Sequence, residues 1–412
     1  MEEEKENVLP KSFNKKFLYP LLIIFIFLAF NSQVFSKSYE DIALYYQAWK
    51  LVNTKFVDQT NNNQDWSKWE HRYDSVIQSP EDAYVAIDTM VASLNDPYTR
   101  FLKPKDFEEE ASSIRGSLKG IGVQITERDG KIIVLSPLED TPAERAGLLP
   151  DDEILSIDGV STKGMNITKA SEKIRGKKGT KVNLLIKRAN TPNRIYTIER
   201  DEINLKSVST KTPFDTTKLD EQVGYIRLSS FISRNAATEF RTALEKYSDK
   251  KGIIIDLRSN SGGLLTNAIL IADMFLNGEI IVSTVDRDGY KDTCRSSKKY
   301  ISDKPLVVLI NKGSASASEI LSGALKDNQR ALLVGENTFG KGVVQEVNKM
   351  NGGSGMNITI QKYLTPNGTD IDKKGIAPDV EVKLSMEDAK KKNDTQLLKA
   401  QELLKRMITA QS

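Results

Sequence analysis

The sequence is poor in the two residues that most often carry metal and acid–base chemistry. It has one histidine, His71, and one cysteine, Cys294, in 412 residues. A single cysteine cannot close an internal disulfide, and one cysteine with one histidine cannot make the usual zinc ligand sets, so we expect no metal site. A serine–histidine–aspartate triad would have to use His71, whose charged surroundings (residues 66–72) are typical of an exposed helix. The sequence therefore disfavours zinc-based and histidine-based hydrolysis.

An excess of charge of one sign is also lacking. Charged residues make up 28% of the chain, but the formal net charge is only +3. Such a balance gives no field strong enough to attract nucleic acid or an anionic membrane, so we expect no nucleic-acid partner. The length permits two or three domains, because single hydrophobic cores stop growing at roughly 250–300 residues.

An apolar run near the N-terminus predicts export. Two lysines precede residues 17–30, a run of 14 residues that is shorter than the roughly 20 needed to span a bilayer. The small residues Val34 and Ser36 follow, which predicts a signal peptide over residues 1–36 with cleavage after Ser36. The alternative is an uncleaved membrane anchor, extended by residues 31–35. In either case we expect the rest of the chain outside the cytoplasm, in the periplasm or in a compartment like the thylakoid lumen.

The spacing of apolar residues divides the remaining chain into four segments. Residues 37–114 have helical spacing and predict a helical segment, with a turn at 96–101 that packs on a neighbouring domain. Residues 115–205 read as short strands with two short helices. Residues 206–380 alternate strands rich in Val, Ile and Leu with helices, which predicts an α/β core with helices on both faces of a sheet. Residues 381–412 predict a helical tail.

The strand-rich segment is marked by glycines at particular places. Gly120-Ile121-Gly122-Val123 stand at its head, Gly147 follows its first short helix, and Gly159 lies in a turn after a strand. This order resembles a PDZ domain over about ninety residues. The alternative is a structural β-rich domain in which the glycines serve only as turns.

The resemblance to a PDZ domain implies a peptide-binding groove. A peptide would add as a strand beside residues 122–125, while backbone N–H groups of residues 119–122 capture its terminal carboxylate. The second short helix, 168–175, would form the opposite wall and end at Arg175. We expect Arg175 to pair with an acidic group or carbonyl of a neighbouring domain only after a peptide has shifted the module. The simpler alternative is a cation that offsets the helix dipole.

Two loops in the α/β segment follow buried strands and precede helices. Residues 311–319 crowd small residues, including Ser316, at a helix start, where the dipole and free N–H groups favour developing negative charge. Taken alone, this loop is also an ordinary helix cap. Residues 256–263 end in paired glycines that let a backbone N–H point into a cleft. A phosphate-binding loop is the rival interpretation of 256–263, but its glycine motifs are missing.

A third loop places Lys341 between two glycines at the start of a strand. To act as a base this lysine must be neutral, so its pKa of about 10.4 must fall, and burial in an apolar pocket has that effect. Gln345 would lie on the same face of the strand, where its amide oxygen can hold the amine. The alternative is an exposed lysine in a glycine-rich turn.

Together and in this order, the three loops closely resemble those of the C-terminal processing peptidases. The resemblance extends from the turn at residues 96–99 to residues 375–379 and covers nearly all of the mature chain. It implies five site residues: the nucleophile Ser316, the base Lys341, the assisting Gln345, and the oxyanion donors Gly262 and Ala317.

The resemblance implies an exported serine endopeptidase with a crotonase- or ClpP-like core and no metal or cofactor. It also implies protein or peptide substrates that are recognised by a free C-terminal tail. Two alternatives stay open, a catalytically inactive PDZ adaptor and an acyl-CoA enzyme of the crotonase type. Neither accounts for Lys341 together with Gln345, and coenzyme A is a cytoplasmic metabolite. Assembly into a homo-oligomer and membrane attachment through an uncleaved N-terminus also stay open.

Overall fold

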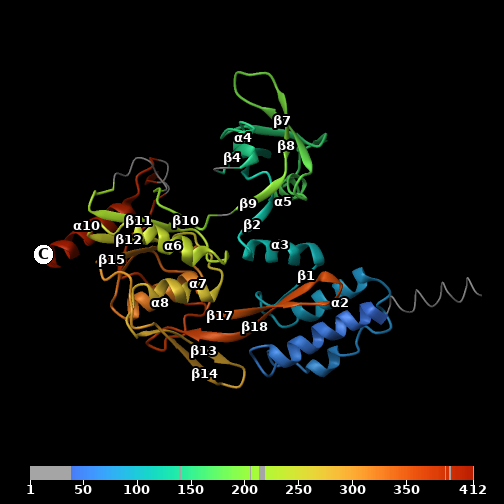
Figure 1. The fold of residues 1–412 in the computed structure, drawn as a ribbon. Coiled ribbons are helices and arrows are strands. Elements are labelled where there is room, and N and C mark those ends of the chain that lie inside the picture. The colour runs from blue at the N-terminus through green and yellow to red at the C-terminus, as the bar shows by residue number, and fades with distance from the viewer. Residues whose placement is uncertain are drawn as a thin grey trace, which may run out of the picture. The chain divides into compact units, whose positions relative to one another are not determined.

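The computed structural model describes residues 39–138, 141–204, 206–212, 219–385, 387–388 and 391–411 (Figure 1). The expected signal peptide and its cleavage site lie outside these residues. Within the described part, no helix is both long and apolar enough to cross a bilayer. Contacts divide the chain into two compact units. The helical unit comprises the chain up to Lys105 with Gln345–Ile360, and the larger unit comprises Asp106–Val344 with Gln361–Ser412.

The helical unit buries the apolar faces of its helices in one aromatic-rich core. Its helices cover residues 39–55, α2 (Pro80–Ala92) and the short 3-10 helix η2 (Trp66–Trp69). Side chains at helical spacing, such as Tyr45 and Met90, are fully buried there. The unit is completed by chain from far along the sequence, because Met350, Met356 and Ile358 belong to the same core.

The turn expected at residues 96–101 is present, but it leads into a strand that the sequence analysis did not predict. The Asp96 carboxylate accepts the N–H groups of Tyr98 and Thr99 at 3.1 Å each. Strand β1 (Arg100–Leu102) then pairs antiparallel with β18 (Gly355–Leu364), with Arg100 opposite Asn357. Three residues are too few for an alternation of polar and apolar side chains to be recognised.

The strand-rich segment forms the expected sheet of short strands. The sheet has the order β3-β4-β5-β7-β8, with β6 paired to β5, and a separate pair joins β2 to β9. The bounds are β2 (Ser117–Gly120), β3 (Val123–Arg128), β4 (Lys131–Pro137), β5 (Glu153–Ile157), β6 (Val160–Ser161), β7 (Lys181–Lys187), β8 (Arg194–Glu199), β9 (Asp201–Asn204), α4 (Pro142–Arg145) and α5 (Ile167–Ile174). Strand β3 ends the order, so one of its edges is not paired within this sheet.

The core of the larger unit is the predicted α/β arrangement. A sheet of order β10-β11-β12-β15-β16-β19 is parallel except for β10. The bounds are β10 (Val208–Ser209), β11 (Val223–Leu228), β12 (Gly252–Asp256), β15 (Leu306–Ile310), β16 (Leu332–Gly335), β19 (Val380–Glu381), α6 (Ala236–Glu245), α7 (Leu265–Asp273), α8 (Ala317–Asp327) and α10 (Thr395–Gln411).

Alternate side chains of the central strands face different helices. Ile253 and Ile255 of β12 belong to the core that contains α6, α7 and α8, whereas Ile254 belongs to the core that contains Leu397 and Leu404 of α10. Helices therefore cover both faces of the sheet, as its continuous runs of Val, Ile and Leu predict (Figure 1).

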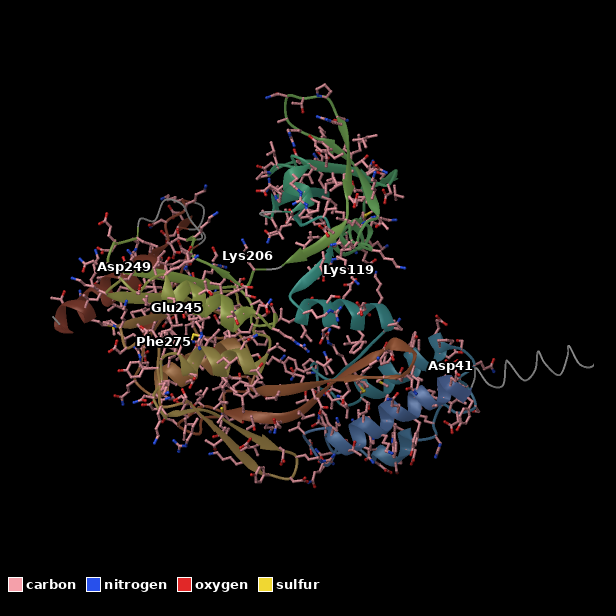
Figure 2. All side chains as sticks on the ribbon, viewed as in Figure 1. Asp41, Lys119, Lys206, Glu245, Asp249 and Phe275 are labelled. Atoms are coloured by element: carbon pink, nitrogen blue, oxygen red, sulfur yellow. The ribbon has the colours of Figure 1, made fainter. Side chains whose placement is uncertain are left out.

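A second sheet has the order β1-β18-β13-β14, and β17 pairs with β18. It contains β13 (Ile280–Asp286), β14 (Lys291–Arg295), β17 (Val343–Lys349) and β18, and a short 3-10 helix η3 (Asn351–Gly353) connects the last two. Phe275, labelled in Figure 2, lies between α7 and β13 and contacts Phe240 edge to face at 6.1 Å between ring centroids. Strands β17 and β18 both run from one unit into the other.

Candidate active site

The turn from β15 into α8 holds Ser316 in an unusual backbone conformation. Ser316 is the residue before the first turn of α8, and its φ of 53° and ψ of −113° lie in a region that favours glycine. A non-glycine residue is kept there only when its surroundings force it, and such strain concentrates at functional sites. The position also places the side chain at the positive end of the helix dipole.

Two neighbouring serines are committed to structural hydrogen bonds. The hydroxyl of Ser314 donates to the carbonyl oxygen of Leu257, and that of Ser318 donates to the carbonyl oxygen of Asn260, both at 2.8 Å. Both serines are fully buried, whereas Ser316 is partly exposed. Of the three, Ser316 is thus the residue whose position suits a nucleophile. The two bonds also fix the 311–319 loop against the 256–263 loop.

Gly262 lies directly beside Ser316. Its φ is 98°, and a Cβ at this position would come within 2.9 Å of the Ser316 Cβ and 3.0 Å of the Ala317 nitrogen, so a side chain has no room. The two expected oxyanion donors therefore flank the serine. The Gly262 N–H donates to Oδ1 of Asn260 at 2.9 Å, so an oxyanion bound here would compete with that amide.

Lys341 is held in a loop that only glycine can form. Gly340 has a φ of 90°, and a Cβ there would come within 2.9 Å of the backbone nitrogen of Gly375. Lys341 itself is partly buried. Lys341 and Gln345 were expected on one face of a strand, but β17 begins at Val343, so strand alternation does not extend back to the lysine.

A buried carboxylate connects the serine turn to the lysine loop. Oε2 of Glu319 accepts the N–H of Ser316 at 2.8 Å and the N–H of Lys341 at 2.9 Å. Its Oε1 accepts the N–H of Gly340 at 2.7 Å and the hydroxyl of Thr338 at 2.6 Å. Glu319 was not among the expected site residues. A glutamate three residues after a helix-capping serine is the available signal, and it predicts only the bond to the serine N–H.

A tyrosine makes a second connection between the same two residues. The hydroxyl of Tyr363 in β18 lies 2.5 Å from the carbonyl oxygen of Lys341 and 3.3 Å from that of Ser316. Tyr363 is 1% exposed. No sequence signal points to it, because the contact depends on how β18 crosses the core.

Gln345 belongs to the helical unit, while Ser316, Lys341, Gly262 and Ala317 belong to the larger unit. Its side-chain nitrogen is buried and has no hydrogen-bond acceptor among the described residues. The assisting role of Gln345 stays a prediction.

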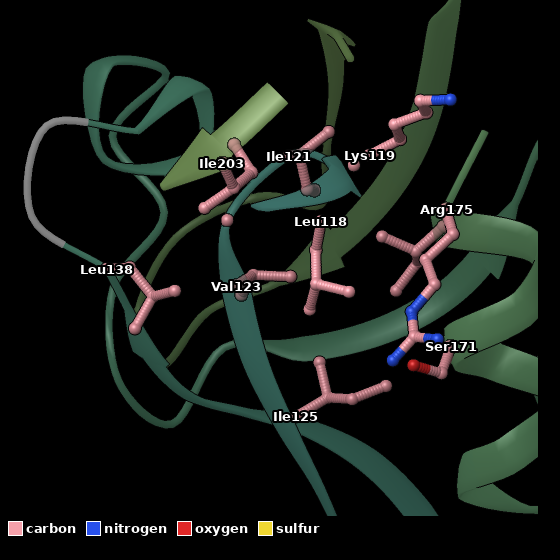
Figure 3. A pocket seen from close by; sticks show the side chains of 12 residues that line it. Leu118, Lys119, Ile121, Val123, Ile125, Leu138, Ser171, Arg175 and Ile203 are labelled. Carbon is pink, nitrogen blue, oxygen red and sulfur yellow. The ribbon is translucent and has the colours of Figure 1, made fainter. Parts of the chain in front are cut away.

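The strand-rich segment contains a groove between β3 and α5. Figure 3 shows Val123 and Ile125 of β3 on one side of the groove and Ser171 and Arg175 on the helix side. The other expected binding residues, Gly120, Ile121 and Gly122, also line it. Most of its lining side chains are apolar and the unpaired edge of β3 borders it, which are the two features that strand addition requires.

Arg175 already has an acidic partner. Nη1 of Arg175 donates to Oε2 of Glu109 at 2.7 Å, and Glu109 lies in α3 (Pro104–Ile114), the helix that leads into the strand-rich segment. Such a pairing was expected only in a peptide-shifted state. The structure differs because Arg175 follows the last residue of α5 in an extended conformation that lets its side chain reach α3.

A buried ionic network lies beneath the 256–263 loop. Arg258 is 6% exposed and donates to both Asp256 and Asp394 at distances of 2.6–3.1 Å, and also to Gln396. The hydroxyl of Tyr225 donates to Asp256 at 2.7 Å. Burial by itself raises the pKa of Asp256, but the Arg258 guanidinium and these hydrogen bonds outweigh it, so the pKa lies below its usual range.

The two rare residues lie away from the buried chemistry of their units. His71 is in a turn, with 71% of its side chain exposed, and its Nδ1 lies 2.9 Å from Oδ2 of Asp74. Cys294 is a free thiol in β14. The exposure expected for His71 is present, although the residue lies in a turn instead of a helix.

Comparison with known proteins gives the same two modules. The model of peptidase family S41 matches residues 222–382, and a PDZ domain model matches residues 133–188. A carboxyl-terminal-processing protease of Synechocystis sp. is 42% identical over 346 residues, which are 82% of this chain and 80% of the relative. A carboxy-terminal processing protease of Bacillus subtilis, CtpA, is 40% identical over 302 residues, which are 73% of this chain and 63% of the relative.

A solved structure shares the fold. The photosystem II D1 C-terminal processing protease aligns with a TM-score of 0.57 at 33% identity, covering 83% of this chain and 93% of that chain.

Proposed function

Since this chain belongs to the carboxyl-terminal-processing proteases of peptidase family S41, we propose that it is an exported endopeptidase with Ser316 as nucleophile and Lys341 as general base. The family makes it a serine-type peptidase, which is the predicted activity, and removes the acyl-CoA alternative. One observation carries the proposal: a single carboxylate oxygen of Glu319 accepts the N–H groups of both residues.

The proposed reaction is acyl transfer to serine. Neutral Lys341 takes the hydroxyl proton of Ser316 as the oxygen attacks a peptide carbonyl. The N–H groups of Ala317 and Gly262 stabilise the oxyanion, provided that Gly262 releases Asn260, and Lys341 then protonates the leaving amine. Water, deprotonated by Lys341, hydrolyses the acyl-enzyme. Gln345 would hold the amine through its amide oxygen.

Substrate choice is proposed to lie in the PDZ groove. A free C-terminal tail would pair with the open edge of β3, and its carboxylate would bind the N–H groups of residues 119–122. Export from the cytoplasm completes the proposal, because the N-terminal segment predicts it.

Labelling with a phosphonofluoridate tests the nucleophile. The reagent phosphonylates an activated serine hydroxyl and releases fluoride, so we expect mass spectrometry to find one added phosphonyl group, on Ser316. Ser314 and Ser318 serve as internal controls in the same peptide, because their hydroxyls are buried and bonded to carbonyls. A label on either of these, or none after long incubation, would show that the assignment is wrong and would favour the inactive adaptor.

A second prediction concerns Arg175 as a sensor of bound tail. A tail carboxylate that enters the groove competes with Glu109 for the guanidinium, and this changes how the module contacts α3. We expect Arg175→Ala to lose tail-stimulated cleavage of a protein while a short untailed peptide is cleaved as before.

The matched control is Lys178→Ala, which breaks an exposed ion pair with Asp201 in the same segment. It should leave both activities unchanged. Equal loss of both activities in Arg175→Ala, or no loss, would show that Arg175 only offsets the helix dipole or supports the fold.

A further inference from the structure

Two side chains contact the backbone of both reactive residues, one at their N–H groups and the other at their carbonyl oxygens. Glu319 accepts the N–H groups of Ser316 and Lys341, and the Tyr363 hydroxyl lies within hydrogen-bond distance of both of their carbonyl oxygens. Glu319 is fully buried, and its four donors, with Gly340 and Thr338 included, are neutral N–H and O–H groups. Hydrogen bonds to an ionised carboxylate are roughly twice as strong as those between neutral groups.

The covalent chain does not fix this spacing by itself. Glu319 and Lys341 are 22 residues apart, and the chain between them passes through most of α8 and all of β16. The lysine loop itself has glycine on both sides of Lys341 and no regular structure. The hydrogen bonds on Glu319 therefore link the loop to the serine turn at Lys341 itself, together with Tyr363, while a backbone bond from the Phe339 N–H to the carbonyl oxygen of Ser314 at 3.0 Å joins the same segments two residues earlier.

We propose that Glu319 and Tyr363 are positioning residues that keep Lys341 within proton-transfer reach of Ser316. The proposal rests on the Ser316–Lys341 pair of the proposed function and assigns what aligns that pair. Neither residue touches substrate, so each acts through the two backbone segments that it joins.

Removing the carboxylate should slow the chemical step and leave substrate binding unchanged. In Glu319→Gln one oxygen becomes an NH2 group, which then faces N–H donors at the oxygen it replaces. The loop must move to relieve this, and a misplacement of 1 Å costs about 100-fold in rate. We expect kcat to fall by about that factor on a short untailed peptide, with KM unchanged.

Two milder changes test the same arrangement. Tyr363→Phe keeps the buried ring and removes only the hydroxyl. Thr338→Val removes one donor to Glu319 and also the acceptor of the Ile376 N–H, and Thr338→Ser restores both bonds. We expect both Tyr363→Phe and Thr338→Val to lower kcat by roughly 10-fold, and Thr338→Ser to recover most of the loss, because each change removes only part of the alignment.

The chain offers matched controls for both chemical changes. One oxygen of Glu239, in the first turn of α6, accepts the N–H groups of Ser207 and Val208 at 2.7 and 3.2 Å, so Glu239→Gln makes the same change away from the lysine loop. Tyr45, in the helical unit, is fully buried and its hydroxyl donates to the carbonyl oxygen of Trp69. Both Glu239→Gln and Tyr45→Phe should leave kcat near wild type.

A double-mutant cycle separates positioning from a general effect on the fold. The rate of phosphonofluoridate labelling is measured for wild type, Glu319→Gln, Lys341→Ala and the double variant. If Glu319 acts by aligning Lys341, its substitution slows labelling in the wild-type background and adds nothing once Lys341 is gone. Equal slowing in both backgrounds, or none in either, overturns the proposal. Label on a serine other than Ser316 in wild type instead overturns the proposed function, and this inference with it.

Discussion

Ser316→Ala and Lys341→Ala each lower the rate of cleavage of a tailed protein by at least roughly 10⁴-fold, since a nucleophile and its base act as one unit. The double variant is no worse than either single variant, for the same reason. Tail affinity stays at the wild-type value, because the groove residues lie in a separate sheet. Mass spectrometry of the cleaved substrate measures the rate, and fluorescence anisotropy of a labelled tail peptide measures the affinity.

Three further substitutions make the result specific. Ser322→Ala is the matched control, because Ser322 lies in the same helix with a buried hydroxyl that has no hydrogen-bond partner among the described residues. It should keep full activity. Lys341→His should stay inactive, since imidazole is shorter and differently shaped, and Gln345→Ala should be milder because an amide carries no proton. Near wild-type rates in Lys341→Ala would falsify the proposed base, and so would full activity in Lys341→His.

Asp394→Ala lowers the free energy of unfolding of the α/β core by about 1–3 kcal/mol, the cost of leaving buried N–H donors of Arg258 without their acceptor. Asp394 and Asp256 share the guanidinium of Arg258, and all three side chains are buried. Asp394 also accepts the N–H of Leu397 at 3.0 Å at the start of α10. Asp394→Asn keeps an acceptor for that N–H, so its loss should be smaller.

The matched control is Glu402→Gln, farther along α10, whose exposed pairs with Lys399 and Arg406 should contribute little to stability. Hydrogen exchange of the β12 peptide is the suitable measurement. Tryptophan fluorescence is not, because Trp49, Trp66 and Trp69 all lie in the helical unit. Equal protection of β12 in Asp394→Ala and Glu402→Gln would show that the network does not stabilise the sheet.

The same network predicts how the core responds to acid. The pKa of Asp256 is lowered in the folded chain, so its ionised form contributes stability above the unfolded value of about 3.9, and that contribution is lost as the pH falls through the folded pKa. We expect β12 to stay protected at pH 5 and to lose protection below about pH 4. A loss that begins at pH 6 would point to another group.

Local patterns predicted the elements of the core closely. The short strands expected among the PDZ-like glycines are present, as in β5, and so is the alternation of strands and helices expected after them, as in β11 followed by α6. The resemblance correctly predicted the family, the fold class and the activity class. It also placed Ser316 and Lys341 in loops that the structure brings to one carboxylate.

The features that the sequence did not predict depend on distant contacts. Nothing local distinguishes Ser316 from Ser314 and Ser318; their difference comes from carbonyl groups of the neighbouring loop. From the sequence alone, Tyr363 is predicted only to be a buried residue of a strand. Glu319 is predicted only to cap a helix. A hydrogen bond between segments that are far apart in sequence produces no periodic pattern of residue types along the chain. Such a bond can therefore be identified only in the folded structure.

The helical unit has a consequence for the order in which the chain folds. Its core includes Met350, Met356 and Ile358, which are synthesised long after the helices at residues 39–92. Until they arrive, the apolar faces of the first helices lack part of their partner, and such exposed surface promotes aggregation. The helices at residues 39–92, although they are synthesised before the rest of their core, are thus among the last parts of the chain to finish folding. A fragment that ends before residue 345 should need a holding chaperone wherever it is produced.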